Sequence, residues 1–251
     1  MRRGSIIGGA LACLLASAAA AEAVDVELVL AVDASGSVNE REFALQIGGL
    51  AAAFRDPAVQ DAAISGPEGR VAVAVLLWAD ARGRRAASAW RVIDGPAAAE
   101  GVAAMIEGMA ARRGPALGRS GTGIGAAVFE ALEMIRLNEF EGTRKIVDVS
   151  GDGRETPLAF GEALALPEAL RRAARREVTV NGLPILADDP NLASYYEHRV
   201  ISGPDSFALP AADFDDFARA IRLKLLRELR ALYGSAPDFP SRPVKTATIR
   251  P

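Results

Sequence analysis

Short apolar segments rich in β-branched residues alternate with helix-patterned segments along nearly the whole chain. Among the apolar segments that run into an aspartate are VDVELVLAVD at 24–33 and TRKIVDVSGD at 143–152. Runs that are apolar on both faces are typical of central parallel strands, which need a crossover between them. The pattern therefore predicts an α/β fold: a Rossmann-like, doubly wound and mainly parallel sheet with helices on both faces.

The other expected elements follow the same alternation. Strands are predicted at 70–80, 87–95, 177–186 and 206–211, with 87–95 as an antiparallel edge strand. Helices are predicted at 39–54, 96–110, 124–137, 167–176 and 212–233, and a polar loop at 187–203. Because there is no internal repeat, we expect one domain over 24–233, followed by a disordered, proline-rich tail at 234–251.

Residues 1–23 have the three parts of a secretory signal peptide. Two arginines precede an apolar stretch at 6–21, and the small-x-small sequence AEA ends at Ala23, with AAA at 18–20 as an alternative cleavage site. A retained membrane anchor would need about 20 strongly apolar residues, and a lipoprotein acylated at Cys13 would need a better lipobox. We therefore expect an exported protein, periplasmic or secreted and of bacterial type, without a membrane span after cleavage.

Composition narrows the possible chemistry. Cys13 is the only cysteine, so the mature chain is expected to have no disulfide, no thiolate metal site and no cysteine nucleophile. The net charge is −3 at pH 7, and acidic and basic residues are interspersed. Without a basic stripe interleaved with aromatic residues, a nucleic-acid partner is not expected.

The stretch DASGS, directly after the first strand, offers three side-chain oxygens in one turn: those of Asp33, Ser35 and Ser37. Asp152 stands at the end of another expected strand, and the carboxyl ends of parallel strands form the ligand-binding edge of such sheets. A hydroxyl from the glycine-rich SGTGIG segment could complete the ring. Hard divalent cations take oxygen ligands, so the pattern indicates a cation site.

The sequence Asp33-Ala34-Ser35-Gly36-Ser37 matches the D-x-S-x-S signature of von Willebrand factor A domains. Thr122 in GTGIG resembles the separate metal-site threonine of this family, and Asp152 in VDVSGDG resembles its second aspartate. The resemblance covers 24–233 and extends to a bacterial group of short exported A-domain proteins of unknown function (DUF1194-like). It implies the A-domain fold and a metal-ion-dependent adhesion site (MIDAS) formed by Asp33, Ser35, Ser37, Thr122 and Asp152.

The resemblance also implies roles. Ser35, Ser37 and Thr122 would contact Mg²⁺ (or Mn²⁺ or Ca²⁺) directly or through water, while the two aspartates would act largely through water and accept hydrogen bonds from the hydroxyls. An unknown partner protein would complete the coordination with an Asp or Glu carboxylate. Mostly neutral ligands leave the cation electrophilic enough to attract that carboxylate. The expected function is therefore non-enzymatic protein binding.

Other interpretations of the same residues stay open. Ser37 and Glu40 form an S-x-x-E capping box, Thr122 could cap the following helix, and Ser120 could replace it as a ligand. The site could also be vestigial, or could serve a hydrolase whose cation activates water, although a general base beyond the two aspartates is lacking. The fingerprints of dinucleotide binding, of the P-loop and of the nucleophile elbow are absent.

Several further polar residues are expected outside the site. Asp148, in the middle of a strand, is expected to be a paired structural acid. His198, the only histidine, is expected to have a surface or loop role rather than a catalytic one. Arg112, Arg113 and Arg119 could attract an acidic partner but are expected to be solvated surface charges.

Overall fold

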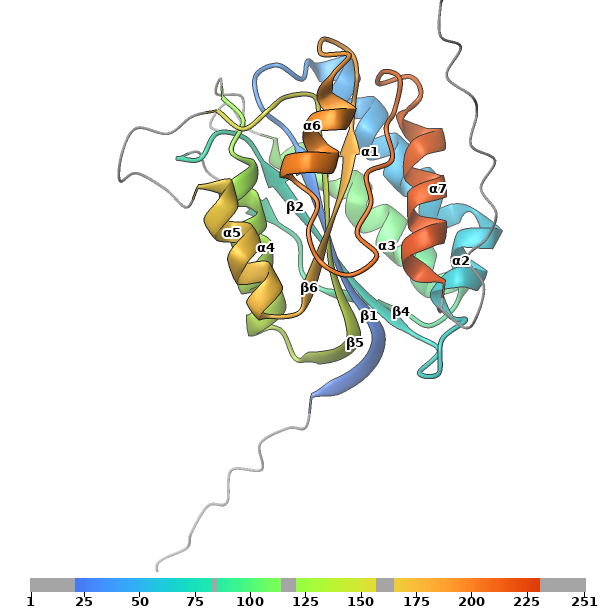
Figure 1. Ribbon diagram of the computed structural model, residues 1–251. Coiled ribbons are helices and arrows are strands. Elements are labelled where there is room, and N and C mark those ends of the chain that lie inside the picture. Colours follow the sequence, from blue (N-terminus) through green and yellow to red (C-terminus); the bar gives the residue numbers. More distant parts are fainter. Residues whose placement is uncertain (1–20, 83–84, 114–120, 157–164, 231–251) are drawn as a thin grey trace, which may run out of the picture.

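A computed structural model describes residues 21–82, 85–113, 121–156 and 165–230 (Figure 1). Its central sheet has the strand order β3-β2-β1-β5-β6, and β4 also pairs with β2. β1, β2, β5 and β6 are mutually parallel, whereas β3 and β4 are antiparallel to β2. The strands are β1 (Glu22–Asp33), β2 (Val71–Trp78), β3 (Ala86–Ala87), β4 (Arg91–Ile93), β5 (Phe140–Gly151) and β6 (Val178–Pro184).

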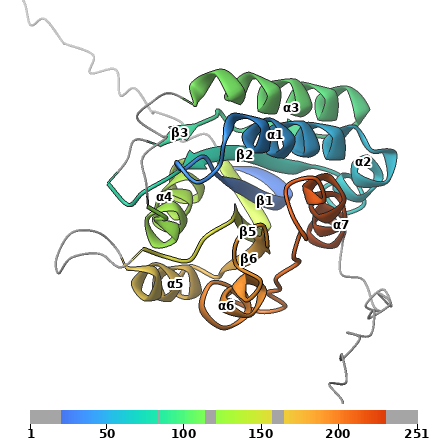
Figure 2. The same cartoon turned by 90° about the horizontal axis from the view of Figure 1, so that it is seen from above.

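Helices cover both faces of this sheet, as the view from above in Figure 2 shows. α1, α2, α3 and α7 pack on one face, and α4, α5 and α6 pack on the other. The helices are α1 (Glu40–Arg55), α2 (Pro57–Ala63), α3 (Pro96–Met109) with a short 3₁₀ turn at Ala110–Arg112, α4 (Ile124–Leu137), α5 (Leu166–Arg175), α6 (Leu192–Arg199) and α7 (Phe217–Leu229).

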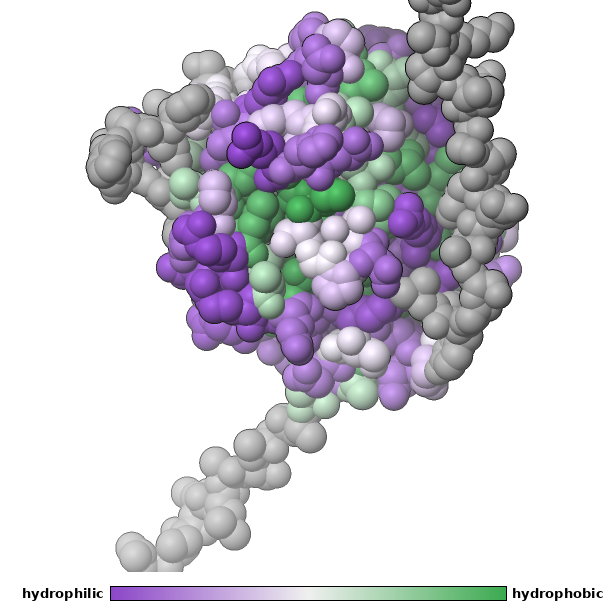
Figure 3. Space-filling model, viewed as in Figure 1, coloured by the Kyte–Doolittle hydropathy of each residue, from purple (hydrophilic) through white to green (hydrophobic). Residues whose placement is uncertain are grey.

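Strand β1 explains the two-sided core. Its alternate residues Leu28 and Leu30 face the α1 layer, while Val29 and Ala31 face the α4 layer, and all are buried. The surface helices are apolar on one side only: α5 buries Leu166 and two alanines and turns its arginines outward, where Figure 3 shows a hydrophilic surface. The predicted mainly parallel α/β fold is confirmed.

The differences lie at the periphery of the sheet. The predicted edge strand 87–95 is two short strands, β3 and β4. The segment 206–211 is no strand of its own: it makes only isolated bridges, from Ala208 to Gly182 on β6 and from Ala211 to Ile185 directly after β6. One reason is Pro210, which has no N–H to donate to a ladder.

Helix predictions also need correction. The expected loop 187–203 contains α6, and α2 was missed although Asp56 caps it and Pro57 occupies its first turn, a common helix start. The helix expected at 212–233 begins only at Phe217. The predicted signal peptide (apart from its last three residues), the predicted tail and residues 231–233 lie outside the described residues.

A buried ionic cluster joins α7 to the sheet. Lys224 Nζ lies 2.7 Å from Asp148 Oδ1 and also pairs with Glu228, and all three residues are at most 2% exposed. Asn181 on β6 donates to Glu228 Oε1 at 2.8 Å. Asp148 is therefore a paired structural acid, as predicted, because a buried charge needs such partners.

Within the described part of the chain, no helix combines the length and the apolar character needed to cross a membrane.

The start of β1 bears on the predicted cleavage of the signal peptide. Glu22 N donates to Glu139 O at 2.8 Å, and the Glu22 carboxylate forms an ion pair with Arg70 at 2.8 Å. Ala23 is paired with Glu141 on β5. The bond after Ala23 therefore lies inside β1, whereas cleavage after the alternative AAA sequence at 18–20 would leave the strand whole.

We predict that the exported protein begins at Ala21. Intact-mass measurement and N-terminal sequencing of the protein from the exported fraction will check this prediction. A chain that begins at Val24 would contradict it and would show that the first two residues of β1 are dispensable.

Candidate metal centre

The candidate site lies at the carboxyl ends of β1 and β5, the upper edge of the sheet in Figure 1. These strands are parallel neighbours, and Val32 on β1 is paired with Ser150 on β5. Asp33 ends β1 and Asp152 directly follows β5, so the pairing places both acids at the same edge. Asp33 is fully buried and Asp152 is 6% exposed.

The DASGS turn is ordered by its own polar groups. Asp33 Oδ1 accepts a hydrogen bond from Ser35 N at 2.8 Å, and Gln46 Nε2 donates to Asp33 O at 3.1 Å. Ser35 Oγ lies 3.0 Å from Ser37 Oγ. Ser37 Oγ in turn donates to Asp152 Oδ1 at 3.0 Å. A chain of side-chain oxygens thus runs from the β1 turn to the end of β5.

Thr122 approaches this chain from the segment before α4. Thr122 N donates to Thr156 Oγ1 at 2.8 Å, and Thr156 N donates to Thr122 O at 2.8 Å. Thr122 Oγ1 faces Gly153, where an added Cβ would come within 2.8 Å of it. Thr122 is therefore fixed beside the segment that carries Asp152, at the same edge as the other four predicted residues.

The capping roles considered for the two hydroxyl residues are wrong. The N-cap of α1 is Asn39, whose side chain accepts from Glu42 N at 3.0 Å, while Glu42 accepts from Asn39 N at 2.8 Å. The capping box therefore begins two residues after Ser37. At α4 the N-cap position is Gly123, without a side-chain cap. Neither Ser37 nor Thr122 therefore serves as the N-cap of the helix that follows it, and the rival Ser120 lies outside the described residues.

The donor set fits a hard divalent cation. Neighbouring ligands of an octahedral ion with bonds near 2.1 Å are about 3.0 Å apart, which is the spacing of Ser35 Oγ to Ser37 Oγ and of Ser37 Oγ to Asp152 Oδ1. The described residues contain no group of three or more His, Cys, Asp or Glu side chains arranged to hold a metal.

Electrostatics at the site also favour a cation. Burial, and after it the charge of Asp152, raise the pKa of Asp33 to about 7, against hydrogen bonds from Ser35 that lower it. Burial likewise raises the pKa of Asp152, against the hydrogen bond from Ser37. Two neighbouring buried carboxylates are costly to ionise, and a bound divalent cation would offset that cost.

Arg113 was expected to be a solvated surface charge, but it binds the DASGS turn and the two residues that follow it. Its guanidinium donates to Ser35 O and Asn39 O, each at 3.2 Å, and to Val38 O. It also lies 4.7 Å from the centre of the Phe43 ring. The neighbouring Arg112 instead donates to Ala87 O, and Arg119 lies outside the described residues. No sequence pattern predicts this contact, because the acceptors are backbone carbonyls.

Glu155 and Thr156, on the segment that follows Asp152, also help to hold the candidate site in place. Glu155 Oε2 accepts from Gly125 N at 3.0 Å, in the first turn of α4, and burial raises the pKa of Glu155 to about 7. Thr156 pairs with the backbone of Thr122, as described above. His198, in contrast, is exposed on α6 and contacts Ser194, in line with the expected surface role.

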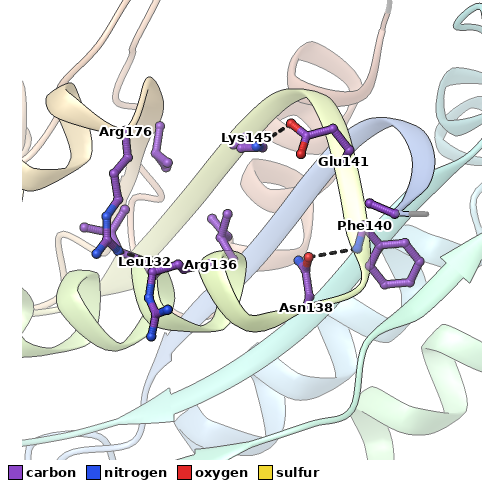
Figure 4. Close-up of a pocket in the computed structure, with 10 residues that line it drawn as sticks. Leu132, Arg136, Asn138, Phe140, Glu141, Lys145 and Arg176 are labelled. Carbon is purple, nitrogen blue, oxygen red and sulfur yellow. Dashed lines mark hydrogen bonds and ion pairs between the residues drawn. The ribbon is translucent and has the colours of Figure 1, made fainter. Parts of the chain in front are cut away.

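A surface pocket of about 470 Å³ lies at the opposite end of the sheet, near the beginnings of β5 and β6 (Figure 4). Three cationic side chains line it, and each is paired: Arg136 and Arg176 with Glu133, at 2.7 and 2.9 Å, and Lys145 with Glu141, at 2.8 Å. The pocket shares no residue with the candidate metal centre.

We predict that Arg113→Ala weakens binding of Mn²⁺ by about tenfold, since it removes hydrogen bonds that order the turn, each worth about 1 kcal/mol. Isothermal titration calorimetry of the full chain will measure the affinity. Arg112→Ala is the matched control and should bind as the wild type does. Equal affinities for Arg113→Ala and the wild type would contradict a role for Arg113 in ordering the site.

Comparison with known proteins places the chain in a family. The model of the family described as "Protein of unknown function (DUF1194)" matches residues 23–233. No curated protein matches the sequence.

The fold is shared with solved structures of low sequence identity. The pilus adhesin SpaC from Lactobacillus rhamnosus GG aligns with a TM-score of 0.56 and 13% identity, over 82% of this chain and 31% of SpaC. The vWF domain of the type V pili tip protein Mfa5 from Porphyromonas gingivalis aligns with a TM-score of 0.52 and 12% identity, over 86% of this chain and 99% of that domain.

Proximal thread matrix protein 1 from the mussel byssus aligns with a TM-score of 0.57 and 16% identity, over 83% of this chain and 46% of that protein. A second structure of the same protein, described as having a zinc-occupied MIDAS motif, aligns with a TM-score of 0.50. This chain thus spans less than half of the SpaC and mussel structures that it matches. The likeness establishes the von Willebrand factor A fold.

Proposed function

The chain belongs to the DUF1194 family and has the fold of a von Willebrand factor A domain, and we propose that it binds a partner protein through a divalent cation held at the candidate metal centre. One observation carries this proposal: the continuous chain of oxygens from Ser35 through Ser37 to Asp152, with 3.0 Å between neighbours, beside the buried Asp33. No structural role of these residues in capping a helix accounts for it.

The proposed roles follow from burial and hydrogen bonding. Ser35, Ser37 and Thr122 would hold Mg²⁺, Mn²⁺ or Ca²⁺ with neutral hydroxyls, and Asp33 and Asp152 would orient those hydroxyls and water molecules. Such a cation keeps most of its charge and attracts an outside carboxylate. Ser37 is exposed, so a partner could reach the site. The proposed partner therefore presents an Asp or Glu side chain.

The related folds support a role in adhesion rather than catalysis. SpaC and Mfa5 are a pilus adhesin and a pilus tip protein, and the mussel matrix protein has a zinc-occupied MIDAS motif. We propose by analogy that this chain acts outside the cytoplasm, in the periplasm or as a secreted protein, after cleavage of its signal peptide. No membrane anchor or nucleic acid takes part in the proposed function.

A hydrolase would need a general base at the same cation. Glu155 is a further carboxylic acid on the segment after Asp152, and its pKa of about 7 would suit a base. However, one of its oxygens accepts a hydrogen bond from the first turn of α4, and the other is buried. Glu155 therefore serves to fix α4, and we propose no enzymatic activity.

We predict that the full chain binds Mg²⁺ and Mn²⁺, that Asp152→Ala abolishes this binding, and that Ser37→Ala weakens it at least tenfold. Each variant removes an oxygen of the proposed site. Calorimetric titration will measure the affinities, and Ser194→Ala, on the exposed face of α6, is the matched control for loss of a serine hydroxyl. Equal titrations for the wild type and Asp152→Ala would refute the site.

We also predict that capture of a partner depends on the cation. The wild-type protein should retain a protein from the exported fraction in Mg²⁺, and should lose it in chelator or when Asp152 is replaced by alanine. Quantitative mass spectrometry of the retained proteins will measure this difference. Retention that is unchanged by chelator and by Asp152→Ala would show that any partner binds elsewhere.

A further inference from the structure

Tyr196, on α6, lies with its ring against two glycines of the sheet. An added Cβ at Gly182, on β6, would come 2.5 Å from Tyr196 Cδ1, and an added Cβ at Gly151, on β5, would come 3.1 Å from the Tyr196 hydroxyl. Any larger residue at these positions would clash with the ring or crowd the hydroxyl. Tyr196 is fully buried as a result, although α6 is a short and largely polar surface helix.

The Tyr196 hydroxyl lies near Asp33, one of the residues of the candidate metal centre. The same added Cβ at Gly151 would come 2.9 Å from Asp33 Oδ2, so both oxygens lie about 3 Å from one point. Neither oxygen is hydrogen-bonded to any described residue, and both are buried. Asp33 Oδ1, in contrast, has its donor in Ser35 N.

Burial of a hydroxyl or a carboxylate oxygen without a hydrogen bond is costly. A tyrosine hydroxyl is a donor and a carboxylate oxygen is an acceptor, so each of these groups can satisfy the other. A hydrogen bond to a charged group contributes about 1.5–3 kcal/mol, more than one between neutral groups.

We propose that Tyr196 is a positioning residue of the metal centre, whose hydroxyl donates to Asp33 Oδ2 directly or through one bridging water. With Ser35 N on Oδ1 and Tyr196 on Oδ2, both oxygens of Asp33 are fixed, and the carboxylate is oriented before a cation arrives. This inference rests on the proposed function in so far as Asp33 belongs to a cation site. The hydrogen bond itself does not require a cation.

The first experiment tests the hydrogen bond in metal-free protein. Near-ultraviolet difference absorption will compare Asp33→Ala with the wild type, and Asp33→Ala/Tyr196→Phe with Tyr196→Phe. A tyrosine that donates to a carboxylate absorbs at longer wavelength, so Asp33→Ala should shift the tyrosine band to shorter wavelength. That shift should disappear in the Tyr196→Phe background. The same difference spectrum in both backgrounds would overturn the proposal.

The second experiment measures the affinity for Mn²⁺ by calorimetry and the melting temperature of the same variants. Tyr196→Phe should bind Mn²⁺ at least tenfold more weakly than the wild type. In metal-free protein it should still unfold in one cooperative transition, with a melting temperature lowered only by the loss of one hydrogen bond, because the ring is retained. Ser194→Ala, which removes an exposed hydroxyl from the same helix, is the control and should bind within about twofold of the wild type.

The outcomes separate this inference from the proposed function. Wild-type binding with equal affinity for Tyr196→Phe overturns the role of Tyr196 and leaves the metal site standing. If the wild type binds no divalent cation, the proposed function fails, and the spectral comparison alone decides whether Tyr196 and Asp33 are joined.

Discussion

The parallel pairing of β1 with β5 is the constraint on which the candidate site depends. The two strands are paired in one register from Glu22 with Phe140 to Val32 with Ser150, so their carboxyl ends lie together. Asp33 and Asp152 are separated by more than a hundred residues of sequence, and only this pairing brings Ser37 within hydrogen-bonding distance of Asp152. A shift of register by one residue would turn the side chains of β1 to the opposite faces and separate the acids.

Around this fixed pair, the remaining parts of the site are held by backbone contacts. Arg113 binds the carbonyls of the DASGS turn and its neighbours, Thr156 exchanges hydrogen bonds with the backbone of Thr122, and Glu155 fixes the first turn of α4. The three hydroxyls proposed as ligands thus stand on segments whose backbones are restrained. A site of this kind needs few charged ligands, because its geometry does not depend on charge attraction to bring the ligands together.

The elements that could be predicted from sequence are those in which local pattern and tertiary role coincide. β1 and the second half of β5 are mostly apolar because both of their faces are buried, and their ends are marked by Asp33 and Asp152, so the strands and the edge of the sheet could be predicted together. The helix start could not be chosen from pattern alone: S-x-x-E at Ser37 and N-x-x-E at Asn39 both fit a capping box, and the structure uses the second.

The features that could not be predicted from the sequence depend on contacts between segments that are far apart in the chain. α6 is polar over most of its surface, and its buried Tyr196 is accommodated only because Gly151 and Gly182 stand on neighbouring strands. Arg113 has the composition of a surface residue, yet its acceptors are carbonyls of a turn more than seventy residues earlier. No sequence pattern identifies the glycines that contact Tyr196 or the carbonyls that accept from Arg113.

The direction of β1 has a practical consequence. The strand has 12 residues, which at about 3.3 Å per residue separates Glu22 from Asp33 by roughly 36 Å, the length of the sheet. Anything joined ahead of Glu22 is therefore attached at the pole of the molecule opposite to the candidate metal centre. A purification tag or a surface tether placed there would orient the protein on a bead or sensor chip with its metal-binding edge facing the solution, whereas attachment near α6 would obstruct it.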